Sequence, residues 1–202
     1  MKKLLIAGLL LLGISATAFA QKGDFNIYPK VGAGIHNSVS MDGTTIESDS
    51  ASWEVSVEGT RELTDNFEVG LGIGFQQLAD VKNKVGGDRI LDGRDYESYP
   101  IYALAKYNFP VVGDSVRPYA VAHLGYAFNG SVKYNNYLDE ESGKQGVDNG
   151  LYAGIGAGFE QNNINVDAMF KTTQAEADGD DFDQYRFVLS VGYRFNIPDF
   201  TK

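Results

Sequence analysis

The chain has 202 residues, which suits one domain, and only 43% of them are hydrophobic, which is too few for a bundle of membrane helices. It holds 27 acidic and 17 basic residues, and this negative balance argues against nucleic acid as a partner. It contains no cysteine, which excludes disulfides, a lipid-modified N-terminal cysteine, thiolate metal ligands and a cysteine nucleophile.

The first twenty residues have the three parts of a cleavable signal peptide. Two lysines after Met1 are followed by an apolar run over residues 4–12 and by the small-x-small triplet Ala18-Phe19-Ala20. The apolar run is short for a membrane-spanning helix, so we favour cleavage over a membrane anchor. We predict a mature chain that begins near Gln21, carries a net charge of −12 and forms one domain over residues 21–202.

From residue 25 onward, apolar and polar residues alternate in segments of strand length. Strict alternation puts the two kinds of residue on opposite faces of a strand. A continuous apolar face opposite a polar one is typical of strands that cross a membrane as part of a barrel. The apolar faces of the eight segments, in chain order, are Phe25, Ile27, Val31, Ala33 and Ile35; Trp53, Val55 and Val57; Phe67, Val69, Leu71, Ile73 and Phe75; Tyr99, Ile101, Ala103, Ala105, Tyr107 and Phe109; Pro118, Ala120, Ala122, Leu124, Tyr126 and Phe128; Leu151, Ala153, Ile155, Ala157 and Phe159; Ile164, Val166, Ala168 and Phe170; and Tyr185, Phe187, Leu189, Val191, Tyr193 and Phe195.

In the fourth segment it is undecided which face points outward, because Tyr102 and Leu104 share a face with Lys106. Aromatic residues gather near both ends of the segments, as in the two aromatic girdles of a membrane barrel. Glycines such as Gly70, Gly72 and Gly74 gather on the polar faces, where they make room for large neighbours.

The connections between the segments alternate in length. An outer-membrane barrel of one chain has short turns on the periplasmic side and long loops outside, and an even strand number leaves both termini in the periplasm. We therefore predict an all-β fold, an eight-stranded up-and-down antiparallel transmembrane β-barrel. The short connections are 64–66, 110–115 and 161–163, and the predicted loops are 37–51, 80–98, 130–149 and 175–183.

These features resemble the small outer-membrane β-barrel family, which includes the OmpX-like and OmpA-like barrels. The resemblance covers the mature chain, with strands within about 25–196, and implies a monomer in the outer membrane of a Gram-negative cell, with outer-membrane lipid and the barrel assembly machinery as partners. The ending at Gly192, Tyr193 and Phe195 resembles the family's C-terminal assembly signal. That signal usually finishes the chain, whereas seven residues follow here, which leaves Phe200 as an alternative.

The polar faces of the segments carry charged residues of both signs. An eight-stranded barrel is just wide enough for side chains to fill it, and unpaired buried charge is costly. We therefore predict an ionic plug, with a narrow ion or solute channel of the porin-like kind as the alternative. The predicted lumen network is Lys30, Glu54, Glu58, Glu68, Lys106, Arg117, Glu160, Asp167, Lys171, Arg186 and Arg194.

The four long segments hold seventeen acidic and six basic residues, so nearly all of the net negative charge belongs to the predicted outer face. Solubility and repulsion between loops explain this charge in the simplest way. Divalent ions that bridge the loops to anionic head groups are a further hypothesis, and the candidate ligands are Asp178, Asp180, Asp181 and Asp183. Their spacing does not match an EF-hand, so no firm metal site is predicted.

Catalysis has one candidate pair. His36 and Ser38 resemble the His-x-Ser pairing of lipid A deacylase barrels, in which a histidine base activates a serine beside lipid. The pattern departs at Val39, where that family has asparagine, and the sequence assigns no orienting acid. The second histidine, His123, is interpreted as a satisfied lumen residue.

We therefore expect a non-enzymatic outer-membrane protein without a cofactor, with a structural or surface-interaction role carried by acidic extracellular loops that hold a surface ligand. A narrow channel and a lipid A-modifying enzyme are the alternatives. A soluble lipocalin-like carrier would have an apolar lumen and a polar outside, which is the reverse of this pattern.

Overall fold

The computed structural model describes residues 24–41, 44–48, 52–77, 81–85, 88–94, 97–136, 141–177 and 180–198. The regular structure of these residues is β-strand throughout. They include no helix of the length and hydrophobicity needed to span a bilayer. The predicted signal peptide and Phe200 lie outside the described residues.

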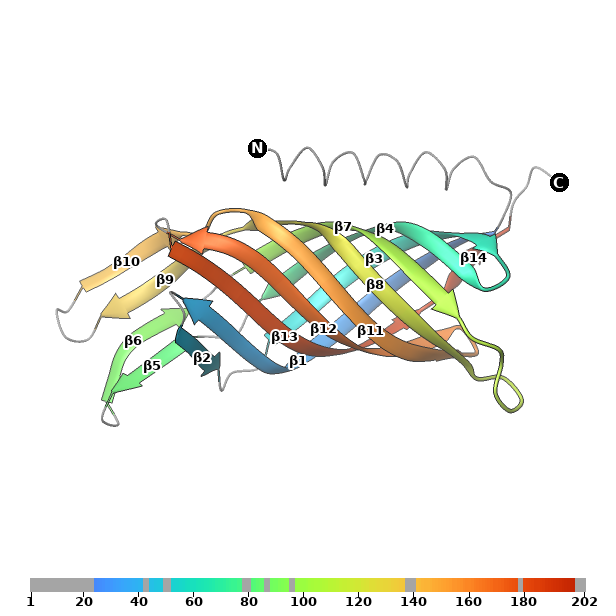
Figure 1. The fold of residues 1–202 in the computed structure, drawn as a ribbon, viewed down its shortest axis with the longest axis horizontal. Helices are drawn as coiled ribbons and strands as arrows, with labels where there is room; N and C mark the ends of the chain where they lie inside the picture. Colours follow the sequence, from blue (N-terminus) through green and yellow to red (C-terminus); the bar gives the residue numbers. More distant parts are fainter. Residues whose placement is uncertain are drawn as a thin grey trace.

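Eight long antiparallel strands form one sheet that closes on itself. They are β1 (Phe25–Met41), β3 (Ser52–Thr64), β4 (Phe67–Gln77), β7 (Glu97–Asn108), β8 (Arg117–Asn129), β11 (Gly150–Gln161), β12 (Ile164–Ala177) and β13 (Asp180–Tyr193). Each strand pairs with the next one in this order, and β13 pairs back to β1. Figure 1 shows the strands tilted around one cylinder. The predicted eight-stranded up-and-down antiparallel barrel is confirmed.

The residues predicted to face lipid form the outside of the barrel. Ile73 and Ile155 have exposed fractions of 59% and 67%. In the fourth segment the face with Tyr102 and Lys106 points inward, since these two side chains are buried in the lumen with exposed fractions of 1% and 5%. A surface that is apolar all round a charged interior is the reverse of a soluble protein and suits a hydrocarbon solvent.

Aromatic rings contact one another near both ends of the barrel wall. At the end with long connections, the Phe75 ring lies 5.3 Å from the rings of both Trp53 and Tyr99. At the other end, the rings of Tyr193 and Phe195 are 4.8 Å apart. These outward clusters fit the two girdles expected from the sequence, since aromatic rings favour the level of the head groups.

Inward glycines make room for tyrosines. A Cβ atom at Gly72 would lie 2.5 Å from the ring of Tyr102, and one at Gly158 would lie 2.7 Å from the ring of Tyr119. These distances are too short for any side chain. The glycines of β4 and β11 thus allow large polar rings to fill the lumen.

The short connections lie together at one end of the barrel (Figure 1). The turn between β11 and β12 consists of Asn162 and Asn163, whose φ angles of 51° and 67° lie in the left-handed region that asparagine tolerates. At the same end, β14 (Phe195–Ile197) pairs with Phe25–Ile27 of β1. Part of the segment after the predicted assembly signal therefore belongs to the barrel wall.

The prediction of loops over the long segments is wrong for much of their length. The connections hold β2 (Thr44–Ser48), β5 (Val81–Val85), β6 (Asp88–Arg94), β9 (Ser131–Asn136) and β10 (Glu141–Gly146). The strand β2 pairs with the end of β1, whereas β5, β6, β9 and β10 form a second sheet of four strands, called here the outer sheet. It lies beyond one end of the barrel in Figure 1.

The last long segment, 175–183, is also mostly strand, because β12 and β13 continue their pairing as far as Ala177 and Asp180. Sequence alternation marks a strand where one of its faces meets an apolar environment, such as lipid or a hydrophobic core. Strands that extend past the membrane have no apolar face, so the same pattern cannot reveal them.

The lone tryptophan provides a test of the membrane orientation. Trp53 is half exposed on the outer wall near the end of the barrel, and its Nε1 donates a hydrogen bond to Gln77. In vesicles, bromine atoms near the head groups should quench its fluorescence more strongly than bromine atoms deep in the acyl chains. If aqueous iodide quenched Trp53 as strongly as it quenches free tryptophan, the wall would not face lipid. The variant Trp53→Phe, which lacks tryptophan, gives the background fluorescence.

Candidate functional site

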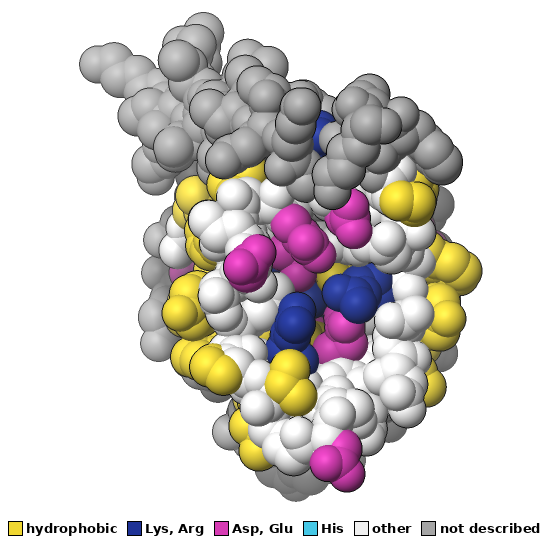
Figure 2. Space-filling model, turned by 90° about the vertical axis from the view of Figure 1, so that its right-hand side faces the viewer, with side chains coloured by type: hydrophobic (Ala, Val, Ile, Leu, Met, Phe, Trp, Pro, Cys, Tyr) yellow, Lys and Arg dark blue, Asp and Glu magenta, His cyan; other side chains and the backbone are white. Residues whose placement is uncertain are grey.

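The lumen of the barrel contains ion pairs in three groups along its length. Figure 2, a view from the end with the short turns, shows basic and acidic side chains gathered at the centre and hydrophobic ones around the rim. Ten of the eleven residues predicted for the lumen network take part in ion pairs with one another. Arg117 is half-buried, and no ion pair found among the described residues includes it.

Nearest the long connections, one carboxylate serves two cations. Glu54 of β3 pairs with Lys171 of β12 and lies 3.4 Å from a guanidinium nitrogen of Arg186 on β13. The amide of Gln76 also donates to Glu54, at 3.4 Å. This outer layer has one positive charge in excess.

In the middle of the lumen, one cation serves two carboxylates. Lys30 Nζ lies 2.9 Å from Glu58 and 3.0 Å from Asp167. The hydroxyl of Tyr102 donates to Glu58 and that of Tyr119 donates to Asp167, each at 3.0 Å. This layer has one negative charge in excess, so it offsets the layer above it.

Toward the short turns, two cations and two carboxylates alternate. Lys106 Nζ lies 3.5 Å from Glu68 and 3.6 Å from Glu160, and Arg194 lies 3.3 Å from Glu160. The Lys106 ammonium also sits 4.6 Å from the centre of the Tyr28 ring, where the electrons of the ring attract a cation.

Neutral donors complete the coordination of Glu68. Its carboxylate accepts hydrogen bonds from Thr60 at 2.6 Å, Asn108 at 2.7 Å and Tyr28 at 3.2 Å. The charged residues of the lumen were predicted from the sequence, but these donors were not. Tyr28 and Thr60 lie at inward-facing positions of the alternating pattern. Because they are uncharged, the sequence gives less reason to assign them to the network than it does for a lysine or a glutamate.

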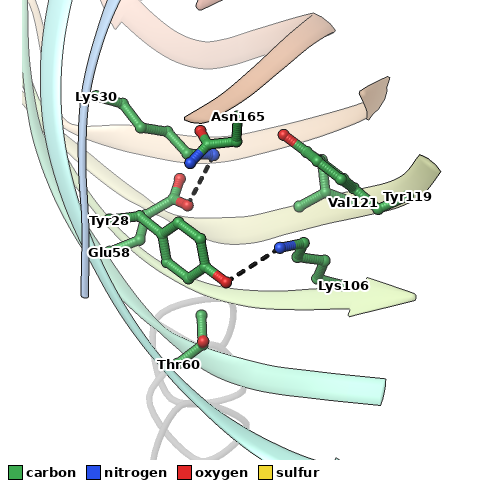
Figure 3. Close-up of a pocket in the computed structure, with 8 residues that line it drawn as sticks. All are labelled: Tyr28, Lys30, Glu58, Thr60, Lys106, Tyr119, Val121 and Asn165. Carbon is green, nitrogen blue, oxygen red and sulfur yellow. Dashed lines mark hydrogen bonds and ion pairs between the residues drawn. The ribbon is translucent and has the colours of Figure 1, made fainter. Parts of the chain in front are cut away.

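Little space remains between these side chains. Residues from five strands point toward one another in Figure 3 and leave a cavity of about 10 Å³ open to the centre of a water molecule, which is room for about one water. An ion with a hydration shell needs far more. The cavity is lined by Tyr28, Lys30, Glu58, Thr60, Lys106, Tyr119, Val121 and Asn165.

His123 lies in the lumen, as expected. Its ring stacks on Tyr102 with a centroid distance of 4.4 Å, and its Nε2 lies 3.5 Å from Glu58. Neither ring nitrogen has a hydrogen-bond partner among the described residues. The hydrogen bonds that a satisfied histidine would make are thus not found within the described part of the chain, and the contacts of the ring are the stacking on Tyr102 and the approach of Nε2 to Glu58.

The candidate catalytic pair follows an irregularity in β1. The pairing of β1 with β13 shifts between Gly34 and His36, so that His36 lies opposite Phe187 and Ser38 lies opposite Tyr185. Both partners belong to the outward face of β13. The strand β2 adds Glu47 opposite Ser38. Backbone register therefore supplies an acidic residue that the sequence could not assign to this pair.

The predicted cation ligands are not drawn together by the part of the chain that the structure describes. Asp178 lies outside it, Asp180 pairs with Ala177 at the end of a hairpin, and Asp183 accepts a hydrogen bond from the Tyr185 hydroxyl at 3.4 Å. No group of three or more metal-ligating side chains is found within the described ranges.

The chain matches a known family over nearly all of its length. A model described as "Outer membrane protein beta-barrel domain" matches residues 6–195. Among curated proteins, the chain is similar to the uncharacterized protein PM1543 of Pasteurella multocida (strain Pm70), with 28% identity over 231 residues that cover 95% of this chain and 97% of that protein.

Solved structures of outer-membrane proteins have a similar fold. Ail, the attachment invasion locus protein of Yersinia pestis, solved in complex with the heparin analogue sucrose octasulfate, is 19% identical with a TM-score of 0.51, over 87% of this chain and 100% of Ail. Neisserial surface protein A is 13% identical with a TM-score of 0.50, over 85% of this chain and 97% of that protein. At such identities the likeness concerns the fold alone.

The middle layer predicts a large effect of removing its cation. Lys30→Met leaves Glu58 and Asp167 buried without their shared partner, and we expect a loss of about 3–5 kcal/mol in the free energy of unfolding. Urea titration in lipid vesicles, followed by the gel mobility of the folded barrel, measures it.

The triple variant Lys30→Met/Glu58→Gln/Asp167→Asn should recover most of this loss, because the two carboxylates that Lys30 served become neutral amides. Arg117→Met is the matched control and should change stability by less than about 1 kcal/mol. A Lys30→Met barrel as stable as the wild type would show that the layers do not hold the lumen together.

Proposed function

Because the chain belongs to the family of outer membrane protein beta-barrel domains and lies in the cell outer membrane, we propose that it acts without catalysis, as a barrel that contacts partners at the cell surface. One observation carries the proposal: paired charges fill the middle of the lumen, where the cavity between them has room for about one water. A filled lumen supports a structural role for the barrel and leaves specificity to the segments outside the membrane.

The same observation weighs against the channel alternative. Conduction needs ion sites that bind weakly enough to release their ion. In this lumen Lys30, Glu58 and Asp167 have exposed side-chain fractions of 9% or less and hold one another within 3.0 Å. A permeating ion would have to separate buried pairs, and the cost of unpaired buried charge opposes that.

The surface role falls to the long segments. Their seventeen acidic and six basic residues favour cations or basic surfaces over polyanions of the kind bound in Ail. We propose that divalent ions bridge acidic positions such as Asp180, Asp181 and Asp183 to anionic head groups or to a surface ligand.

A second function, hydrolysis of a lipid ester, is favoured by one observation. The register of β1 and β2 puts Glu47 opposite Ser38, two residues from His36, at the outer end of the lipid-facing wall. A serine, a histidine and an acid are the parts of an acyl-transfer site.

Conductance tests the first proposal. In planar lipid bilayers the refolded chain should give no steady single-channel current. The variant Tyr102→Ala/Tyr119→Ala, which removes two rings from the lumen, should give brief openings and so prove that insertion occurs. A steady wild-type current that Glu58→Ala or Arg186→Ala alters would overturn the plug.

The composition of lipid A tests the second function. Under the non-enzymatic proposal, mass spectra of lipid A from cells that overproduce the wild type and from cells that overproduce Ser38→Ala should be identical. An acyl chain lost with the wild type but kept with Ser38→Ala and with His36→Ala would replace the proposal by catalysis.

A further inference from the structure

One of the three short turns differs from the other two in composition. The turns over residues 64–66 and 161–163 consist of polar residues, Thr-Asp-Asn and Gln-Asn-Asn. The turn between β7 and β8, residues 109–116, begins with Phe-Pro-Val-Val and has Asp114 as its one charged residue. Turns in water are built mainly from Gly, Pro, Asn, Asp and Ser. Consecutive large apolar residues in this turn therefore indicate an apolar contact.

The two valines of this turn are open to their surroundings. Val111 has an exposed fraction of 48% and Val112 one of 61%. The latter equals the openness of Ile73 in the lipid-facing wall, which is 59% exposed. Water around exposed apolar side chains is unfavourable, and this cost is removed when they enter apolar surroundings. The described part of the chain does not provide such surroundings for the two valines.

Hydrogen bonds fix the shape of the turn. The backbone N–H of Val112 donates to the carbonyl of Val116 at 2.8 Å. Gly113 has a φ angle of 63°, in the left-handed region that glycine adopts without strain. At the end of β11, the side-chain amide of Gln161 donates to the hydroxyl of Ser115 at 3.0 Å. The turn is thus closed and attached to a neighbouring strand, while the valine side chains stay uncovered.

The apolar side of the turn continues the lipid-facing wall. Tyr107 of β7 and Phe109 directly after this strand point outward, and their rings contact edge to face at a centroid distance of 5.1 Å. Val111 occupies the next position of the same alternation. In Figure 1 the yellow-green turn leans to one side of the barrel's end instead of extending along the barrel axis. The valines therefore lie beside the membrane rather than below the lumen.

The position along the barrel suits the head groups of the membrane. The polar zone beside each face of the hydrocarbon is roughly 5–7 Å thick. A barrel strand tilted by about 40° advances about 5 Å along the membrane normal over two residues. Aromatic girdles mark the boundary of this zone with the hydrocarbon. Val111, two residues after Phe109, thus reaches the level of the head groups but not the water beyond them.

We propose that the turn between β7 and β8 inserts Val111 and Val112 among the head groups of the inner leaflet and anchors this side of the barrel to phospholipid. The occupant is lipid because the valines continue a surface that already contacts lipid. The other two short turns are polar, so the anchor is one-sided and opposes a change of tilt or depth. The inference concerns the end opposite the long segments and does not depend on the proposed surface role.

The absence of cysteine from the chain allows a test with a single nitroxide label. Val112→Cys and the control Asp65→Cys, in a polar turn, are labelled and refolded into vesicles of phosphatidylethanolamine and phosphatidylglycerol. Electron paramagnetic resonance then compares access of oxygen, which concentrates in acyl chains, with access of a nickel chelate, which stays in water. The ratio of oxygen to nickel access should be at least about fivefold higher at 112 than at 65, because apolar surroundings exclude the polar chelate.

A second label tests whether the valines cause the insertion. Asp114→Cys carries the nitroxide in the same turn and keeps both valines. Adding Val111→Asn/Val112→Asn should lower the access ratio at 114 to the value at 65, because the turn then resembles the two polar turns. The heat-dependent gel shift shows that each variant is folded.

Other results overturn the inference in distinguishable ways. Equal ratios at 112 and 65 would mean that both turns lie in water. A ratio at 114 that the asparagine variant leaves unchanged would mean that the valines do not hold the turn in the lipid. Dipolar broadening between labels at 112 would indicate a second copy of the chain at the turn. A label at 112 that is open to nickel in vesicles but protected in isolated outer membranes would indicate a protein partner in place of lipid.

Discussion

Pairing of β13 with β1 closes the barrel. Hydrocarbon offers no hydrogen bonds to a backbone, so a sheet that crosses it must leave no open edge. Here the first and last strands pair from Lys30 and Gly192 out to Met41 and Phe182, and β14 extends the seam at the other end. Closure then decides which residues face lipid and which share the lumen.

The diameter that eight strands impose explains the chemistry of the lumen. Polar residues must point inward once the outside is apolar, and the space is too narrow for water to solvate them all. The layers around Glu54, Lys30 and Lys106 meet this condition by pairing five cations with five carboxylates. Tyrosines donate further hydrogen bonds to these carboxylates, and glycines on the facing strands make space for their rings.

Beyond the outer end of the barrel the strands no longer contact lipid, so they do not need an apolar outer face. Strands run past the membrane without an apolar face, two hairpins join into the outer sheet, and the register of β1 shifts at Ile35. That shift aligns His36 and Ser38 with outward residues of β13. The acidic residues of the long segments also belong to this region.

The barrel class, the outward face of most strands and the charged residues of the lumen were predictable from the sequence, because lipid on one side requires apolar residues at every second position of a crossing strand. The sequence could not reveal β2, β5, β6, β9 and β10, since strands surrounded by water need no such pattern. The ion pairs between distant residues, such as Lys30 with Asp167, depend on how the strands curl into a barrel and could not be predicted from local patterns. The placement of Glu47 opposite Ser38 likewise depends on the register between strands, which hairpin geometry and pairing across the whole sheet determine.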